Sequence, residues 1–66
     1  MAEWIVQVYQ PTDRAVPSRE FAGDFIDAKK AIIARKRGQT VRFVAPVNAP
    51  LAQIAEMKRL GALETF

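Results

Sequence analysis

The chain has 66 residues, of which 50% are apolar and 26% are charged, and its formal net charge is +3. This length allows one small domain, spanning residues 1–66, that buries only roughly 60% of the surface its unfolded chain exposes, so we expect marginal stability. There is no cysteine and no histidine, which excludes disulfide bonds and the usual zinc sites and leaves oligomerisation as the remaining way to add stability.

The first predicted element is a strand over residues 4–9 that is apolar on both faces except at Gln7. Its alternating residues are Trp4, Val6 and Val8 on one face and Ile5 and Tyr9 on the other. A strand of this kind is usually central in its sheet, or is covered on one side by a partner. We therefore expect this strand to lie inside the sheet.

Residues 15–22 follow a predicted turn at residues 11–14 and allow two interpretations. They form a short hairpin strand, which Pro17 would confine to the edge of the sheet. Alternatively, Ser18 caps an early helical turn that contains Phe21. We favour the edge strand.

The strongest pattern in the chain is a helix that starts at Asp24, ends on Gly38 and leads into a strand over residues 40–45. Asp24 and Asp27 suit the positive N-terminal end of a helix. The basic run at residues 35–37 would complement the negative C-terminal end, and Gly38 would take the left-handed position just beyond it. Pro46 marks the end of the strand.

The apolar residues of this helix form two ridges at helical spacing, Phe25 with Ile32 and Ile26 with Ile33. In one interpretation both ridges face the core, and the alkyl stems of Lys29 and Lys36 cover apolar surface between them. In the other, one ridge packs on the sheet of the protein itself and the other packs on a partner.

A second, shorter helix is predicted from Asn48 as its cap, with Pro50 in its first turn, to Gly61 as its end. The residues that fall on one side of this helix are Leu51, Ile54, Ala55 and Lys58. In the tail, Leu63 and Phe66 would pack back on the domain or add a short strand.

These elements predict an α+β domain in the order β-(β)-α-β-α, with a sheet of two or three strands packed by the main helix and the shorter C-terminal helix. If residues 15–22 were not a strand, the first strand, the main helix and residues 40–45 would form a right-handed parallel βαβ unit. In element order and size the outline resembles the small strand-hairpin-helix-strand proteins with which some bacteriophages inhibit host enzymes. The resemblance is one of architecture and implies no site residues.

No segment approaches the roughly 18 uninterrupted apolar residues of a membrane-spanning helix. The first residues, 1–4, lack the basic region and apolar run of a signal peptide. We therefore expect a cytoplasmic protein with no membrane partner.

Few residues in the chain can perform catalysis. Without histidine or cysteine there is no group that titrates near neutrality and no thiolate, and the only serine, Ser18, has no imidazole to activate it. Asp24 and Asp27, with Glu20 as a third carboxylate, could be imagined as metal ligands, but capping of the helix explains the two aspartates. We therefore expect that the protein is not an enzyme and that it binds no metal ion and no cofactor.

Basic residues are concentrated in a stretch, residues 28–55, that contains no Asp or Glu. They are Lys29, Lys30, Arg35, Lys36, Arg37 and Arg42. We expect them to form one positive patch at the end of the main helix and the adjoining strand. In a plainer interpretation, the basic run at residues 35–37 only complements the helix dipole and keeps the protein soluble.

A functional patch predicts a small, non-catalytic binding protein of the inhibitor or adaptor type that docks on an acidic macromolecular surface, with a protein as the favoured partner. Trp4 and Tyr9 would add aromatic contacts if they are exposed. The first alternative is a low-specificity nucleic-acid-binding protein that uses the same basic residues, although no nucleic-acid-binding motif is present. The second is a structural subunit, such as a homodimer, that associates through an open sheet edge or the spare helix ridge.

Overall fold

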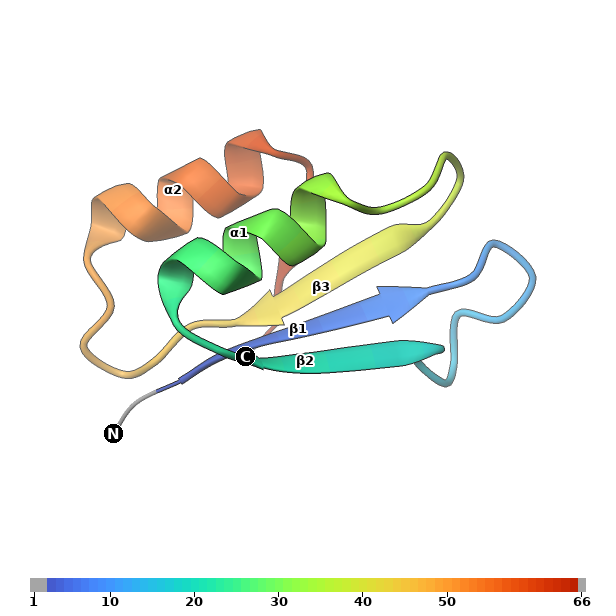
Figure 1. Ribbon diagram of the computed structural model, residues 1–66, viewed down its shortest axis with the longest axis horizontal. Coiled ribbons are helices and arrows are strands. Elements are labelled where there is room, and N and C mark those ends of the chain that lie inside the picture. Colours follow the sequence, from blue (N-terminus) through green and yellow to red (C-terminus); the bar gives the residue numbers. More distant parts are fainter. Residues whose placement is uncertain (1–2, 66) are drawn as a thin grey trace.

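The structure is a computed structural model that describes residues 3–65 of the chain. Its elements, in order, are β1 (Trp4–Tyr9), β2 (Arg19–Gly23), α1 (Phe25–Ile33), β3 (Thr40–Val44), α2 (Leu51–Arg59) and β4 (Leu63–Glu64). They form a small α+β domain with one four-stranded sheet and two helices (Figure 1), which confirms the predicted fold class. The prediction for Phe66 lies outside the described residues.

The strands lie in the order β2-β1-β3-β4. β1 is antiparallel to both of its neighbours, and β3 pairs with β4 in parallel. The expected places of β1 inside the sheet and of β2 at its edge are thus confirmed, although β2 begins at Arg19 and not at residue 15 as predicted. Two crossovers, from β2 through α1 to β3 and from β3 through α2 to β4, advance across the sheet in the same direction. Since crossovers are right-handed, both helices must cover the same face, and Figure 1 shows them on one side of the sheet.

The core lies between that covered face and the two helices. Trp4, Val6 and Val8 of β1 and Val41 and Phe43 of β3 point toward the helices and are buried. The ring of Trp4 lies 5.4 Å from that of Phe25 and 5.9 Å from that of Phe43, measured between centroids, so aromatic contacts join α1, β1 and β3. The other buried core residues are Ala28 and Ile32 of α1, Met57 of α2 and Ala62.

The opposite side of the sheet, called the open face below, carries no helix. Side chains alternate along each strand, so the strand registers define which residues belong to it. They are Ile5, Gln7 and Tyr9 of β1, Glu20 and Ala22 of β2, Thr40, Arg42 and Val44 of β3, and Leu63 of β4.

The prediction that α1 continues to Gly38 is wrong, because the helix ends at Ile33 with Ala34 as its cap. The Arg35 N–H donates to Ile32 O at 3.2 Å, which tightens the last turn. In a continued helix the Lys36 N–H would use that same carbonyl, but here it donates to Gln39 Oε1 at 2.8 Å. Residues 35–38 therefore form a loop, and the positive φ of Gly38, 89°, belongs to the Lys36–Gln39 turn.

The two ridges of α1 have different environments. Ile32 is buried and Phe25 packs against the core, whereas Ile26 and Ile33 are 62% and 61% exposed. The interpretation in which both ridges face the core is therefore wrong. One ridge packs on the sheet, and the other is open to solvent.

The predicted start of α2 is also wrong, since Asn48 does not cap it. The helix begins after Pro50, which occupies the N-cap position without a side-chain hydrogen bond. Asn48 lies instead within a turn closed by the Ala49 N–H and Pro46 O, 3.0 Å apart. On the side predicted to group Leu51, Ile54, Ala55 and Lys58, only Ile54 packs against the core, and the other three are exposed. The fully buried residue of the helix is Met57, which the sequence pattern did not single out.

The end of α2 at Gly61 and the short strand after it are both confirmed. Gly61 has a φ of 97°, and its N–H donates to Lys58 O at 3.0 Å. The Ala62 N–H donates to Met57 O at 3.2 Å, so the helix ends in a Schellman motif. β4 follows directly and pairs with β3. Neither α1 nor α2, the helices of the described chain, has the length and apolar character needed to cross a membrane.

Candidate functional site

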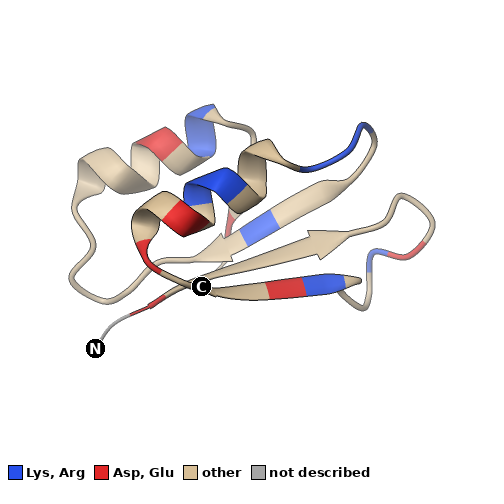
Figure 2. Ribbon diagram, viewed as in Figure 1, with Lys and Arg blue, Asp and Glu red and all other residues tan. Residues whose placement is uncertain are grey.

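The six basic residues predicted to form one patch lie in three separate places (Figure 2). Lys29 and Lys30 belong to α1, and the basic run at residues 35–37 lies in the loop between α1 and β3. Arg42 is on β3, where it pairs with Gln7 on the open face. Since α1 covers the other face, the prediction of a single patch fails at Arg42.

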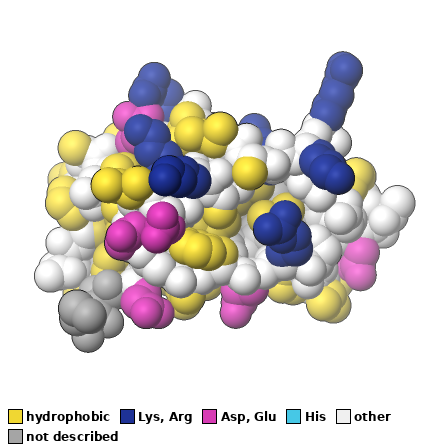
Figure 3. Space-filling model, viewed as in Figure 1, with side chains coloured by type: hydrophobic (Ala, Val, Ile, Leu, Met, Phe, Trp, Pro, Cys, Tyr) yellow, Lys and Arg dark blue, Asp and Glu magenta, His cyan; other side chains and the backbone are white. Residues whose placement is uncertain are grey.

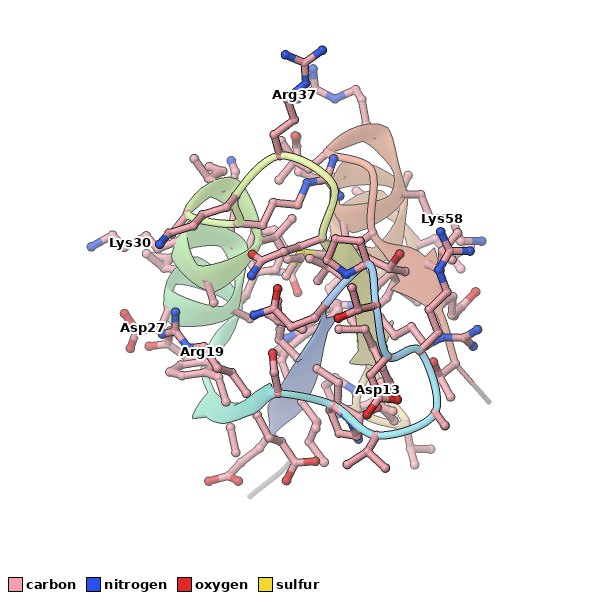
Figure 4. The ribbon with its side chains drawn as sticks, turned by 90° about the vertical axis from the view of Figure 1, so that its right-hand side faces the viewer. Asp13, Arg19, Asp27, Lys30, Arg37 and Lys58 are labelled. Atoms are coloured by element: carbon pink, nitrogen blue, oxygen red, sulfur yellow. The ribbon has the colours of Figure 1, made fainter. Side chains whose placement is uncertain are left out.

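Residues 35–38, called the basic loop below, are held by hydrogen bonds at both ends. Arg35 Nη1 donates to Gly61 O at 3.1 Å, which links the loop to the end of α2. The Gln39 N–H donates to Lys36 O at 3.2 Å and closes the turn. Arg37 lies inside that turn and extends away from the body of the molecule (Figure 4). The loop thus presents Lys36 and Arg37 to solvent while Arg35 anchors it.

A shallow depression lies beside the basic loop. It is lined by Arg35, Lys36, Arg37, Gly38, Gln39, Thr40, Gly61 and Leu63. The sequence does not associate Gly61 and Leu63 with the loop, because Arg35 and its acceptor Gly61 are 26 positions apart. No pattern of neighbouring residues predicts such a contact. It forms because the two helices run parallel, so that their C-terminal ends lie side by side (Figure 1).

A second candidate surface, called the outer stripe below, runs along the solvent side of α1. Ile26, Lys29, Lys30 and Ile33 follow the spacing i, i+3, i+4, i+7 that places residues on one side of a helix. Ile26, Lys30 and Ile33 are exposed, and Lys29 is half-buried. Figure 3 shows hydrophobic side chains lying among Lys and Arg side chains on the visible face of the molecule.

The basic side chains of the outer stripe and the basic loop have no acidic partner within residues 3–65. The ion pairs of that part of the chain are Lys58 with Glu64, at 3.1 Å, and Arg59 with Glu56, both on or next to α2. Asp27 is the only acid within α1, and it lies in the first turn. The charges of Lys29, Lys30, Lys36 and Arg37 are therefore available to another molecule.

The two aromatic residues proposed as partner contacts are buried. Trp4 is 4% exposed and lies in the core, where β1 packs under α1. Tyr9 is 8% exposed, and its hydroxyl donates to Gln7 Oε1 at 3.2 Å. Neither ring offers a face to a partner. The prediction that these residues add aromatic contacts required them to be exposed, and that condition is not met.

The residues considered for catalysis or metal binding have structural partners. Ser18 Oγ donates to Val8 O at 3.0 Å, and Asp24 Oδ1 accepts the Asp27 N–H at 2.8 Å as an N-cap. Glu20 Oε2 accepts from Gln7 Nε2 at 2.9 Å, on the open face and away from the two aspartates. Residues 3–65 contain no group of three Asp or Glu side chains placed to hold a metal ion.

No protein-family model, curated protein or solved structure matches the chain. Function is therefore inferred from the surfaces described above.

Proposed function

We propose that this protein is a small, non-catalytic binding protein that docks its outer stripe and basic loop on an acidic protein surface, as an inhibitor or adaptor would. The observation that carries the proposal is the set of unpaired charges on Lys29, Lys30, Lys36 and Arg37 beside the exposed Ile26 and Ile33. A cytoplasmic location is part of the same proposal.

The two kinds of side chain would contribute differently to binding. Exposed charges at the rim of an interface raise the association rate and select partners of opposite charge, but add little affinity. Ile26 and Ile33 would supply the apolar area that becomes buried. The stems of Lys29 and Lys30 can cover apolar surface while their ammonium groups reach carboxylates. A partner should therefore combine carboxylates with exposed apolar side chains.

Charge reversal in the basic loop tests this proposal. The variant K36E/R37E changes two exposed side chains, so its fold should be retained, which circular dichroism would verify. We expect it to capture at least about tenfold less of an acidic protein from cell extract than the wild type does. The control R42E changes an exposed arginine on the open face and should capture the protein normally. Equal capture by wild type and K36E/R37E, or equal loss in R42E, would refute the proposal.

The nucleic-acid alternative uses the same cations and is less well supported by their arrangement. Arg42 lies on the open face, whereas Lys29 and Lys30 lie on α1 at the other face, and the open face offers no exposed aromatic ring on which a base could stack. The nucleic-acid alternative predicts that the logarithm of the association constant falls steeply with the logarithm of the salt concentration. Amide NMR spectra recorded with added single- and double-stranded DNA at about 50 and about 200 mM salt separate the alternatives, since the favoured proposal predicts no shifts.

A further inference from the structure

The open face combines an apolar row, which contains Ile5, with a charged row beside it. In register across the three long strands, Ile5 lies between Ala22 and Val44, and Gln7 lies between Glu20 and Arg42. Ala22 and Arg42 are exposed, while Ile5 and Val44 are half-buried although no helix covers them. At the sheet edge, Leu63 is 51% exposed beside Arg42. This face therefore has apolar side chains in reach of a partner.

Opposite charges flank the central strand of this face. Glu20 and Arg42 lie on the two sides of Gln7, two strand spacings or roughly 10 Å apart. Within residues 3–65 they form no ion pair. Glu20 instead accepts from Gln7 Nε2, and the Arg42 guanidinium lies 5.9 Å from the centre of the Tyr9 ring. Among residues 3–65, each of the two charges thus lacks an ion-pair partner.

We propose that a second copy of this chain covers the open face and forms a symmetric dimer. A two-fold axis parallel to β1 and above Gln7 keeps the strand direction and places β2 of one copy over β3 of the other. Glu20 of each copy then faces Arg42 of the second copy, so the two ion pairs form together. The same operation stacks Ile5 on Ile5 and Ala22 on Val44. This is the aligned packing that two sheets adopt at about 10 Å separation.

The chemistry of the face selects this occupant over others. Its equal and opposite charges give no net attraction for nucleic acid, and Tyr9 is too buried to stack on a base. A partner with a single sign of charge would satisfy one of the two residues and repel the other. Only a surface with the reversed order of charges satisfies both, and the two-fold copy of the face has that order.

The size of the face predicts a weak dimer. Strand spacings of about 4.8 Å and a rise of about 3.3 Å per residue give a footprint of roughly 20 Å by 15 Å. Two such faces bury less than the roughly 1,200–2,000 Å² of a standard stable interface. We therefore expect dimers at high micromolar concentration rather than at nanomolar concentration. The outer stripe and basic loop stay free, so this dimer is independent of the proposed partner binding.

Reciprocal charge exchange tests the dimer. Sedimentation equilibrium from about 20 µM to about 2 mM covers the range in which so small an interface associates. The wild type should shift from monomer toward dimer. E20R places arginine against Arg42, and R42E places glutamate against Glu20, so each single variant should lower the dimer association constant by about tenfold or more. The double variant E20R/R42E restores opposite charges and should dimerise as the wild type does.

The double variant also has the net charge of the wild type, so its recovery separates the local pairs from a general charge effect. R37E is the matched control for R42E, because it makes the same charge change at the basic loop and should leave the association constant unchanged. A wild type that stays monomeric throughout the range would overturn the proposal. So would single variants that dimerise normally, or a folded double variant that does not dimerise.

Discussion

Gly61 combines two demands that no other residue type meets. Its φ of 97° lies in the left-handed region, which raises the energy of residues with a Cβ atom. A Cβ at this position would also lie 2.5 Å from Arg35 Nη2, because the guanidinium lies over the end of α2 to reach Gly61 O. One glycine thus ends α2 and makes room for the contact that anchors the basic loop.

Gly61→Ala should therefore lower the free energy of unfolding by about 1–3 kcal/mol, from backbone strain and from displacement of Arg35. Gly38→Ala is the matched variant, since its φ of 89° imposes similar strain while its Cβ would meet only Pro11 at 3.4 Å. We expect it to lower the free energy by about 1 kcal/mol. Urea unfolding of both proteins measures the difference. Equal losses of unfolding free energy in the two variants would show that Arg35 can move away from Gly61 without lowering the stability.

The two helices begin in different ways, although the sequence offers a capping residue before each. Asp24 accepts the Asp27 N–H and has the extended backbone of an N-cap, with a ψ of 176°. Before α2, the proline at position 50 takes the N-cap place and contributes no side-chain acceptor. Asn48 lies too far upstream to cap the helix and stays in its own turn.

Asp24→Ala should consequently lower the free energy of unfolding by about 1 kcal/mol, the usual effect of losing an N-cap side chain. Asn48→Ala should change it by less than about 0.5 kcal/mol, as expected of an exposed residue outside any cap. Thermal or urea unfolding of the two variants under one set of conditions tests the pair. A larger loss in Asn48→Ala than in Asp24→Ala would contradict this assignment of the caps.

At the scale of elements, the sequence predicts what depends on neighbours along the chain. A short apolar run locates β1, Pro17 and the following residues indicate an edge strand, and Gly61 marks the end of α2. The sequence does not predict the end of α1, because residues 34–37 suit a helix. The Lys36 N–H is instead bound by a side chain beyond them, that of Gln39. Which side of α2 is buried depends on how the helix packs against the sheet, and the periodicity of the helix does not predict this position.

At the scale of the whole molecule, topology decides which charges meet. Lys29 and Lys30 lie on the helix layer and the basic loop lies at its end, whereas Arg42 lies on the opposite face of the sheet from the two lysines. The distance along the sequence does not show this separation. Side chains alternate along β3, so Arg42 and its neighbour Phe43 lie on opposite faces of the sheet. The same alternation places Glu20 and Arg42 on one face, which appears only when the strand order is known.

The domain has a single small core without disulfide bonds, so its stability should be sensitive to that core and insensitive to the outer stripe. Phe43 is fully buried and contacts Trp4, and Phe43→Ala should lower the free energy of unfolding by about 3–5 kcal/mol. A chain of this length is stable by roughly 3–10 kcal/mol in total, so the substitution removes a large share of the stability. Urea unfolding should show a clearly lower midpoint than for the wild type.

Ile33→Ala is the control for Phe43→Ala on the solvent side of α1, because it removes apolar atoms from a side chain that is 61% exposed. We expect a change in the free energy of unfolding within about 0.5 kcal/mol. Alanine also favours the helix slightly more than isoleucine does. Combined with Ile26→Ala, the change should weaken capture of the acidic partner while the unfolding midpoint stays the same, because these side chains bury little area until a partner covers them. A midpoint that falls as far as in Phe43→Ala would mean that the outer stripe belongs to the core rather than to an interface.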